Sequence, residues 1–178
     1  FDHSRTQAAP KGLAFVLALP LDLSLGLAPG SAAAEMEERA GLFIRSLATQ
    51  AVQSLAEKDT SRDVRIQRFR KMFNDHFAVR TIGRFVLGRY WKKASKDERK
   101  EYLGLFEDLM VMSYVDRFQR FAGENLDVTR TRAESAKTTT VFTQINRSNA
   151  GQPVKVLWRV GAKGETFKIL DVIVEGAS

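Results

Sequence analysis

The spacing of apolar residues changes its period near the middle of the chain, and this change constrains the fold more than any other feature. From Glu35 to about Gly123 the apolar residues recur every three or four positions, which is typical of amphipathic helices. After Gly123 they alternate with polar residues, as in "PVKVLWRV", which is typical of β-strands. Helices first and strands last predict an α+β domain whose N-terminal helices pack on one face of a C-terminal antiparallel sheet.

The helical half contains recognisable start and stop signals. The polar residues "DTS" at 59–61 predict a break between two helices and an N-cap for the second. Gly88 is suited to end a short helix, because glycine tolerates the backbone conformation that a C-cap requires. Ser95 and Glu98 form a capping-box pattern, which predicts a long helix from this point to about Phe121.

The strand half divides into about four alternating runs. They begin at Leu126 and within "KTTTVFTQINR", "PVKVLWRV" and "ETFKILDVIVEG". The connections "NRSNAGQP" and "GAKGE" carry the glycines and polar residues that hairpin turns need. In the last run, alternation places Ile169 and Ile173 on one side of the strand, and Leu170 and Val172 on the other.

The first 34 residues differ from the rest. Arg5 and Lys11 precede an apolar run that ends in small residues, a pattern typical of a secretory signal peptide. We expect cleavage between Ala34 and Glu35, which leaves residues 35–178 as one domain. A domain of this length can bury its own core.

The titratable residues offer little for catalysis or metal binding. The chain has no cysteine, which excludes disulfides, thiolate metal sites and cysteine nucleophiles. Its two histidines, His3 and His76, lie apart, and we expect no metal, no cofactor and no catalytic site. One enzymatic alternative stays open, in which Asp171 or His76 acts as a base on a small apolar substrate. The carboxyl pair of Asp171 and Glu175 is more simply explained by strand-end ion pairs.

The formal net charge of +7 favours an anionic partner. Nucleic acid, an anionic membrane and an acidic protein would all qualify. The stretch "RFVLGRYWKK" places basic residues among aromatic ones, but the helical spacing of the aromatic residues favours burial over base stacking. Nucleic acid is therefore not expected as a partner.

Three stretches carry a resemblance to a known family. They are "FRKMFNDHFAVRTIGRFVLGRYWKKASKDERKEYLGLFEDLMVMSYVDRF", "GENLDV" and "KILDVIVEGAS". The chain from Met36 to Ser178 resembles the MlaC family, also called the toluene-tolerance or ABC transporter auxiliary component family. Members usually continue past the segment matching "EGAS" into a further C-terminal helix, so the domain is expected to lack that helix.

The resemblance implies a soluble periplasmic carrier that moves phospholipid between the outer and inner membranes and so serves outer-membrane lipid asymmetry. Its implied partners are phospholipid, an outer-membrane lipoprotein and an inner-membrane MCE-domain complex driven by an ABC ATPase. It also implies transient contact near membranes and, for a shuttle, a monomer. Family members hold acyl chains in an apolar cavity between the helices and the sheet.

The apolar residues of the long helix and the last strands are suited to line such a cavity, although each would also fit an ordinary core. A carrier of hopanoid or another polycyclic lipid and a protein-binding adaptor stay open as alternatives. The hypothesised lining residues are Phe85, Leu87, Trp91, Phe106, Met110, Tyr114, Val156, Trp158, Ile169, Val172 and Val174.

Overall fold

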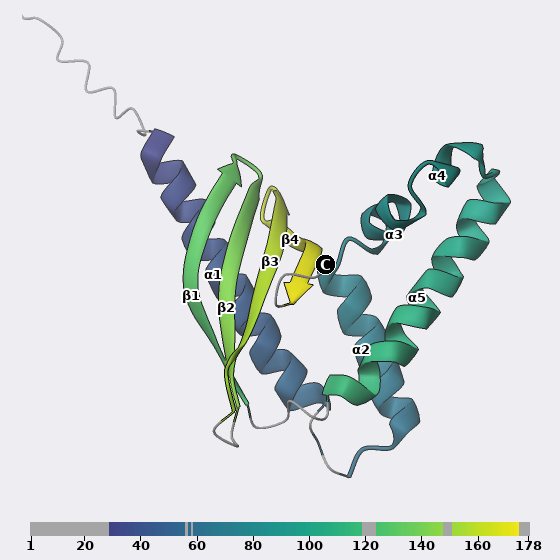
Figure 1. Ribbon diagram of the computed structural model, residues 1–178, viewed down its shortest axis with the longest axis horizontal. Coiled ribbons are helices and arrows are strands. Elements are labelled where there is room, and N and C mark those ends of the chain that lie inside the picture. The colour runs from purple at the N-terminus through teal and green to yellow at the C-terminus, as the bar shows by residue number, and fades with distance from the viewer. Residues whose placement is uncertain (1–28, 56, 58, 119–123, 148–150, 175–178) are drawn as a thin grey trace, which may run out of the picture.

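The computed structural model describes residues 29–55, 57, 59–118, 124–147 and 151–174. Helices precede strands along the described chain, as the change of period predicts (Figure 1). The strands form one antiparallel sheet in the order β1-β2-β3-β4. The elements are α1 (Pro29–Leu55), α2 (Arg62–His76), α3 (Val79–Leu87), α4 (Tyr90–Lys93), α5 (Lys96–Phe118), β1 (Asn125–Ser135), β2 (Thr138–Asn146), β3 (Val154–Lys163) and β4 (Thr166–Val174).

The first hydrophobic cluster lies between α1 and one face of the sheet, and we call it the sheet cluster. In Figure 1, α1 runs behind the strands along this face. The apolar residues of α1 recur at three- and four-residue steps, so they meet the alternate residues that the strands direct to the same side. The buried members are Ala40, Ile44, Leu47, Val141, Val160 and Ile169.

The second cluster joins the end of α1 to α2 and α5, and we call it the helix cluster. The rings of Phe69 and Phe73 on α2 stack with centroids 6.3 Å apart. Val111 and Val115 on α5 are fully buried beside them. Because α1 contributes to both clusters, it connects the sheet to the helical half. The buried members are Ala51, Leu55, Phe69, Phe73, Val111 and Val115.

The segment between α2 and α3 forms backbone hydrogen bonds with the edge strand β4. Phe77 forms an isolated parallel bridge with Ile169, and the backbone N–H of Ala78 donates to the Ile169 carbonyl at 2.9 Å. Lys168 donates to the carbonyl oxygen of Asp75 at 2.6 Å, in the last turn of α2, where a cation is favoured by the helix dipole. Backbone groups that an edge strand would leave open are thus partly paired.

The alternation expected in β4 is wrong in one respect, because Ile169 and Val172 face the same side of the sheet. The register slips between Arg159 and Val160, so Ile169 pairs with Val160 although Asp171 pairs with Arg159. This β-bulge leaves Leu170 as the extra residue. The Leu170 side chain lies over Gly161 of β3. A Cβ at position 161 would come within 2.9 Å of the Leu170 side chain.

The predicted helix caps are confirmed. The Ser61 hydroxyl accepts a hydrogen bond from the backbone of Val64 at the start of α2. Ser95 and Glu98 form both bonds of the capping box, with the Ser95 N–H donating to the Glu98 carboxylate at 2.7 Å. Gly88 ends α3 with a φ of 57°, a conformation that favours glycine.

Two features of the helices differ from expectation, and two expected features lie outside the described residues or mostly outside them. Helix α1 begins at Pro29 and so runs across the expected cleavage point between Ala34 and Glu35. The single helical turn α4 was not expected, because four residues are too few to show a period. The expected extension of α5 to Phe121 lies outside the described residues, as does most of the expected leader.

Candidate functional site

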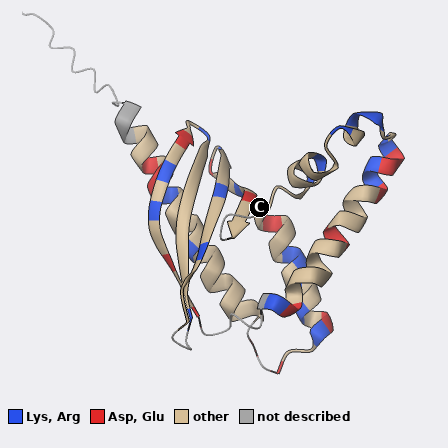
Figure 2. Cartoon of the chain, viewed as in Figure 1, with Lys and Arg blue, Asp and Glu red and all other residues tan. Residues whose placement is uncertain are grey.

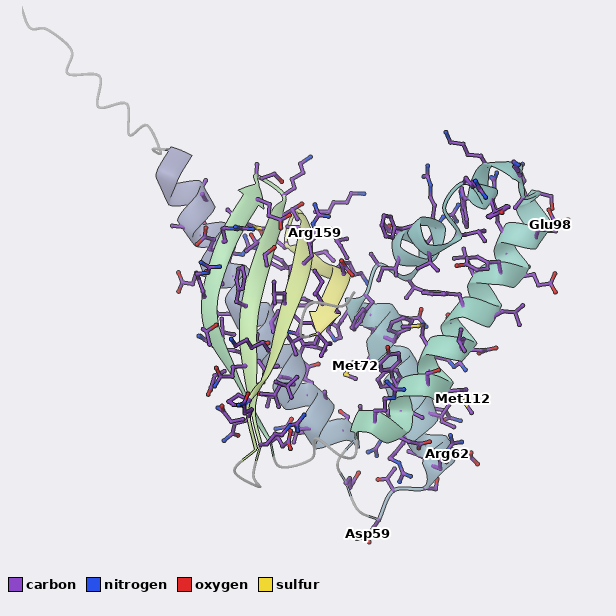
Figure 3. All side chains as sticks on the ribbon, in the orientation of Figure 1. Asp59, Arg62, Met72, Glu98, Met112 and Arg159 are labelled. Carbon is purple, nitrogen blue, oxygen red and sulfur yellow. The ribbon has the colours of Figure 1, made fainter. Side chains whose placement is uncertain are left out.

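The sheet cluster and the helix cluster meet at a set of partly buried apolar side chains. Met72 and Phe77 each pack against both clusters. In Figure 3, Met72 lies between the sheet and α5. We call the junction these two residues together with the partly buried apolar residues that pack on one cluster alone, which are Val79 and Met110 on the helix cluster and Trp158 and Val172 on the sheet cluster.

The sheet side of the junction is formed by Trp158 and Val172, which pair across β3 and β4. The indole Nε1 of Trp158 donates to the Thr143 hydroxyl at 2.9 Å, and that hydroxyl donates to the Val156 carbonyl at 3.0 Å. The polar edge of the indole is therefore satisfied within the protein. Its apolar surface remains partly accessible.

The helix side of the junction is formed by two methionines and an aromatic ring. Met72 on α2 and Met110 on α5 pack on the helix cluster without being fully buried. The ring of Phe77 lies 4.9 Å from that of Phe73, which fixes its position. Methionine is flexible and polarisable, so this surface can adapt to apolar ligands of different shape.

The eleven hypothesised lining residues are distributed over three environments. The buried ones lie in the protein core and are Trp91, Phe106, Val156 and Ile169. The partly buried ones are Leu87, Met110, Trp158 and Val172. The exposed ones are Phe85, Tyr114 and Val174. Met110, Trp158 and Val172 are the lining candidates that pack, partly buried, on one of the two clusters, Met110 on the helix cluster and the other two on the sheet cluster.

Sequence reasoning missed the central members of the junction. Met72 and Phe77 lie in the half of the chain where apolar residues recur every three or four positions, so the sequence showed that they belong to apolar faces. Spacing alone shows which face of a helix is apolar, but not which neighbour covers it. That these two residues lie between two clusters depends on the docking of α2 against β4, which no local pattern records.

The helices after α2 leave several large apolar side chains open to solvent. Phe85 on α3 is 82% exposed and Val86 is 63% exposed. On α5, Leu105 and Leu109 are 62% and 63% exposed and lie one helical turn apart. Exposed apolar surface of this kind marks sites of interaction more often than ordinary surface does.

Two open hollows among the described residues lie elsewhere. One of about 360 Å³ lies beside Met36 and Arg39 of α1 and the hairpin glycine Gly164. The other, of about 300 Å³, lies between α1 and β1, beside Gly41 and Val128. Neither is lined by any of the eleven hypothesised residues, so the expected apolar cavity between helices and sheet stays a prediction.

The candidate bases lie outside the junction. His76 packs against the ring of Phe43 at 5.7 Å, and burial lowers the pKa of its imidazole. Asp171 accepts a hydrogen bond from its neighbour's backbone and pairs in register with Arg159, on the sheet face opposite to Trp158. Glu175 lies outside the described residues. Within the described ranges, no group of histidines and carboxylates is arranged to hold a metal ion.

The arrangement of the junction is therefore suited to apolar contact rather than to proton transfer. None of the helices in the part of the chain that the structure describes has the length and hydropathy to cross a membrane.

Comparisons with known proteins agree with this fold. The family model described as "MlaC protein" matches residues 45–178. A phospholipid-binding protein from Ralstonia solanacearum, solved in complex with a phospholipid, has a similar structure with a TM-score of 0.63. That alignment is 18% identical and covers 77% of this chain and 78% of the other. A search of curated protein sequences found no match. On the extent of the family match, the chain belongs to the MlaC family.

Proposed function

We propose that the chain is a periplasmic carrier that binds phospholipid and moves it between the outer and inner membranes. The observation that carries this proposal is the match to the MlaC family over residues 45–178. The junction supports it, because Met72 and Phe77 pack against both clusters and four more partly buried apolar side chains pack against one or the other. The phospholipid held by the similarly folded Ralstonia protein is the class of ligand proposed for this chain.

An acyl chain needs such a surface in order to leave a membrane. Burial of one methylene is favourable by about 0.8 kcal/mol, so transfer of an acyl chain of about fifteen methylenes from the membrane to water would cost roughly 12 kcal/mol. A carrier removes this cost by replacing the membrane interior with its own apolar side chains. In this proposal, Met72, Met110 and Trp158 contact the acyl chain first.

A ligand would enter by separating the two clusters at the junction. The sheet cluster and the helix cluster share α1 and the connection through Phe77, while Met72 packs against both. Movement of α3 and α5 away from β4 would open the apolar surfaces of Met110 and Trp158 together. The partly buried lining residues Leu87 on α3 and Val172 on β4 would then meet the same ligand.

The finer assignments follow from the family. We propose that the protein receives and delivers lipid through an outer-membrane lipoprotein and an inner-membrane MCE-domain complex powered by an ABC ATPase. In this role phospholipid is the cargo, and the protein acts as a monomeric binding protein rather than an enzyme.

Native mass spectrometry of the purified protein, followed by lipid extraction, tests the proposal. We expect bound phospholipid, or its uptake after incubation with phospholipid vesicles. A protein that stays empty under both conditions would contradict the proposal. Extraction of a polycyclic lipid instead would contradict phospholipid as the cargo.

A pair of variants locates the binding surface. Met72→Trp with Met110→Trp adds bulk at the junction and should lower lipid occupancy. The matched control, Leu105→Trp with Leu109→Trp, adds the same side chains at exposed positions of α5 and should leave occupancy unchanged. Equal occupancy in the two variants, both folded by circular dichroism, would show that lipid binds elsewhere.

A further inference from the structure

We call α3, α4 and α5 the helical arm, and one end of this arm carries a concentration of positive charge. We call residues 80–100 the basic tip, which comprises most of α3, all of α4 and the first turn of α5. It contains eight lysines and arginines but two carboxylates, Asp97 and Glu98. Figure 2 shows Lys and Arg gathered along α4 and the turn into α5, at the end of the arm farthest from the sheet.

One of these cations is used to build the tip. The Nε of Arg99 donates to the Trp91 carbonyl at 2.8 Å, and its guanidinium lies 5.3 Å from the centre of the Trp91 ring. Trp91 is itself buried, so this contact fixes α4 against the start of α5. The other basic residues of the tip are exposed, and in the described part of the chain none of them pairs with a carboxylate within 4.0 Å.

Apolar side chains are exposed among these cations. Phe85, Val86 and Tyr90 are 82%, 63% and 54% exposed. The Tyr90 ring lies near two cations, 5.1 Å from the guanidinium of Arg89 and 5.9 Å from the ammonium of Lys93. The positive φ of Gly88 turns the chain sharply between α3 and α4, so the apolar and basic residues are presented within a short span.

We propose that the basic tip docks the protein on an anionic phospholipid bilayer. Lysine and arginine attract anionic headgroups, while phenylalanine, valine and tyrosine insert at the level where headgroups meet acyl chains. Tyrosine is favoured at that depth because its ring is apolar and its hydroxyl is polar. Lysine stems also cover apolar surface while the ammonium groups stay at the headgroups.

A membrane fits these features better than an acidic protein does. The buried centre of a protein interface is depleted in lysine, whereas a bilayer interface accepts many lysines around a few apolar side chains. The tip has Lys92, Lys93, Lys96 and Lys100 around three exposed apolar residues. The inference goes beyond the proposed function, because it names where the protein meets a membrane and not where it holds its cargo.

Sedimentation with vesicles tests whether the positive charge of the basic tip contributes to membrane binding. We would measure binding of the wild-type protein to vesicles of phosphatidylcholine, with and without phosphatidylglycerol, at low and high salt. Lys92→Gln with Lys93→Gln should weaken binding to the anionic vesicles about thirtyfold. The control Lys155→Gln with Lys163→Gln removes the same charge from exposed positions of β3 and should change binding by less than about twofold.

A second pair of variants tests the apolar contact. Val86→Gln with Tyr90→Gln should weaken binding about tenfold or more. Leu105→Gln with Leu109→Gln makes a comparable change on exposed residues outside the tip and should leave binding unchanged. Thermal unfolding of all variants would show that each is folded.

Two results would overturn the inference. Loss of binding in the controls as large as in the tip variants would show that net charge and general hydrophobicity suffice. Absence of wild-type binding to anionic vesicles would leave an acidic protein as the partner of the tip. Native mass spectrometry of the Lys92→Gln, Lys93→Gln variant keeps this test separate from the proposed function, because its lipid occupancy should match the wild type. A lipid-free protein that still docks through the tip would contradict the proposed cargo but support the docking.

Discussion

The sheet with α1 and the helical arm formed by α3 to α5 use apolar residues in different ways. In the first region, Ile44, Val141 and Val160 are almost completely buried. In the second, residues of the same chemical kind, such as Phe85 and Leu109, are mostly exposed. Burial of the first set stabilises the fold, whereas exposure of the second set gives up that stabilisation. The arm therefore leaves open to solvent the kind of apolar surface that the sheet and α1 bury.

The lengths of the helices explain the difference in coverage. Helix α1 has 27 residues and runs along the sheet, so its apolar face is matched by a wide surface. Helix α5 has 23 residues with apolar side chains on more than one face. Helix α2 covers the face with Val111 and Val115, but the other neighbours, α3 and α4, have only 9 and 4 residues. Such short helices can cover only part of α5, mainly around Phe106.

The largest expected effect is on the sheet cluster. Ile44→Ala removes a side chain that is 1% exposed and should lower the free energy of unfolding by about 3 kcal/mol. The control Leu42→Ala truncates a side chain of the same helix that is 52% exposed, and should cost less than about 1 kcal/mol. Urea unfolding measures both. Equal losses would mean that the two positions do not differ in packing.

A smaller effect is expected at the start of α5. Ser95→Ala removes the hydroxyl that accepts from the Glu98 backbone and should cost about 1 kcal/mol. Ser113→Ala, at an exposed position within the same helix, should be neutral or slightly stabilising because alanine is the better helix former. A Ser95→Ala variant as stable as wild type would show that the capping box contributes nothing in solution.

The free energy of unfolding should also depend modestly on pH, because of a carboxylate on the sheet. A hydrogen bond from Thr140 and the charge of Arg159 lower the pKa of Glu134 below 4.5, its ordinary value. A depressed folded-state pKa contributes stability above the unfolded-state value, and this contribution is lost as the pH falls through the folded-state value.

The variant Glu134→Gln should therefore lose less stability than wild type as the pH falls below about 4.5. Unfolding midpoints in urea across this range would measure the difference. The control Glu101→Gln removes the same charged group from an exposed position of α5. Parallel profiles for Glu134→Gln and wild type would contradict the predicted contribution of this carboxylate.

The smallest effect on stability is expected in the arm. Phe85→Gln replaces a large aromatic residue, yet it should change the free energy of unfolding by no more than about 0.5 kcal/mol, because the ring is 82% exposed. Urea unfolding measures this change. A loss as large as that of Ile44→Ala would mean that Phe85 is packed in solution and that the two regions do not differ.

Some features of the fold could be predicted from the sequence because they depend on neighbouring residues. The capping box at Ser95 and the turn at Gly88 are local, and the change of period identified helices and strands. The β-bulge at Leu170 could not be predicted, because it depends on how β3 and β4 pair. For the same reason, periodicity could not distinguish Met72, which packs against both clusters, from Phe85, which is largely exposed.

Photo-cross-linking tests most directly whether the junction is where lipid binds. The protein would be loaded with a phospholipid that carries a photoactivatable group in its acyl chain, irradiated, digested and analysed by mass spectrometry. We predict adducts on the peptides that contain Met72, Met110 and Trp158. Adducts confined to peptides that contain none of these three residues, or spread evenly over the surface, would contradict a binding site between the two clusters.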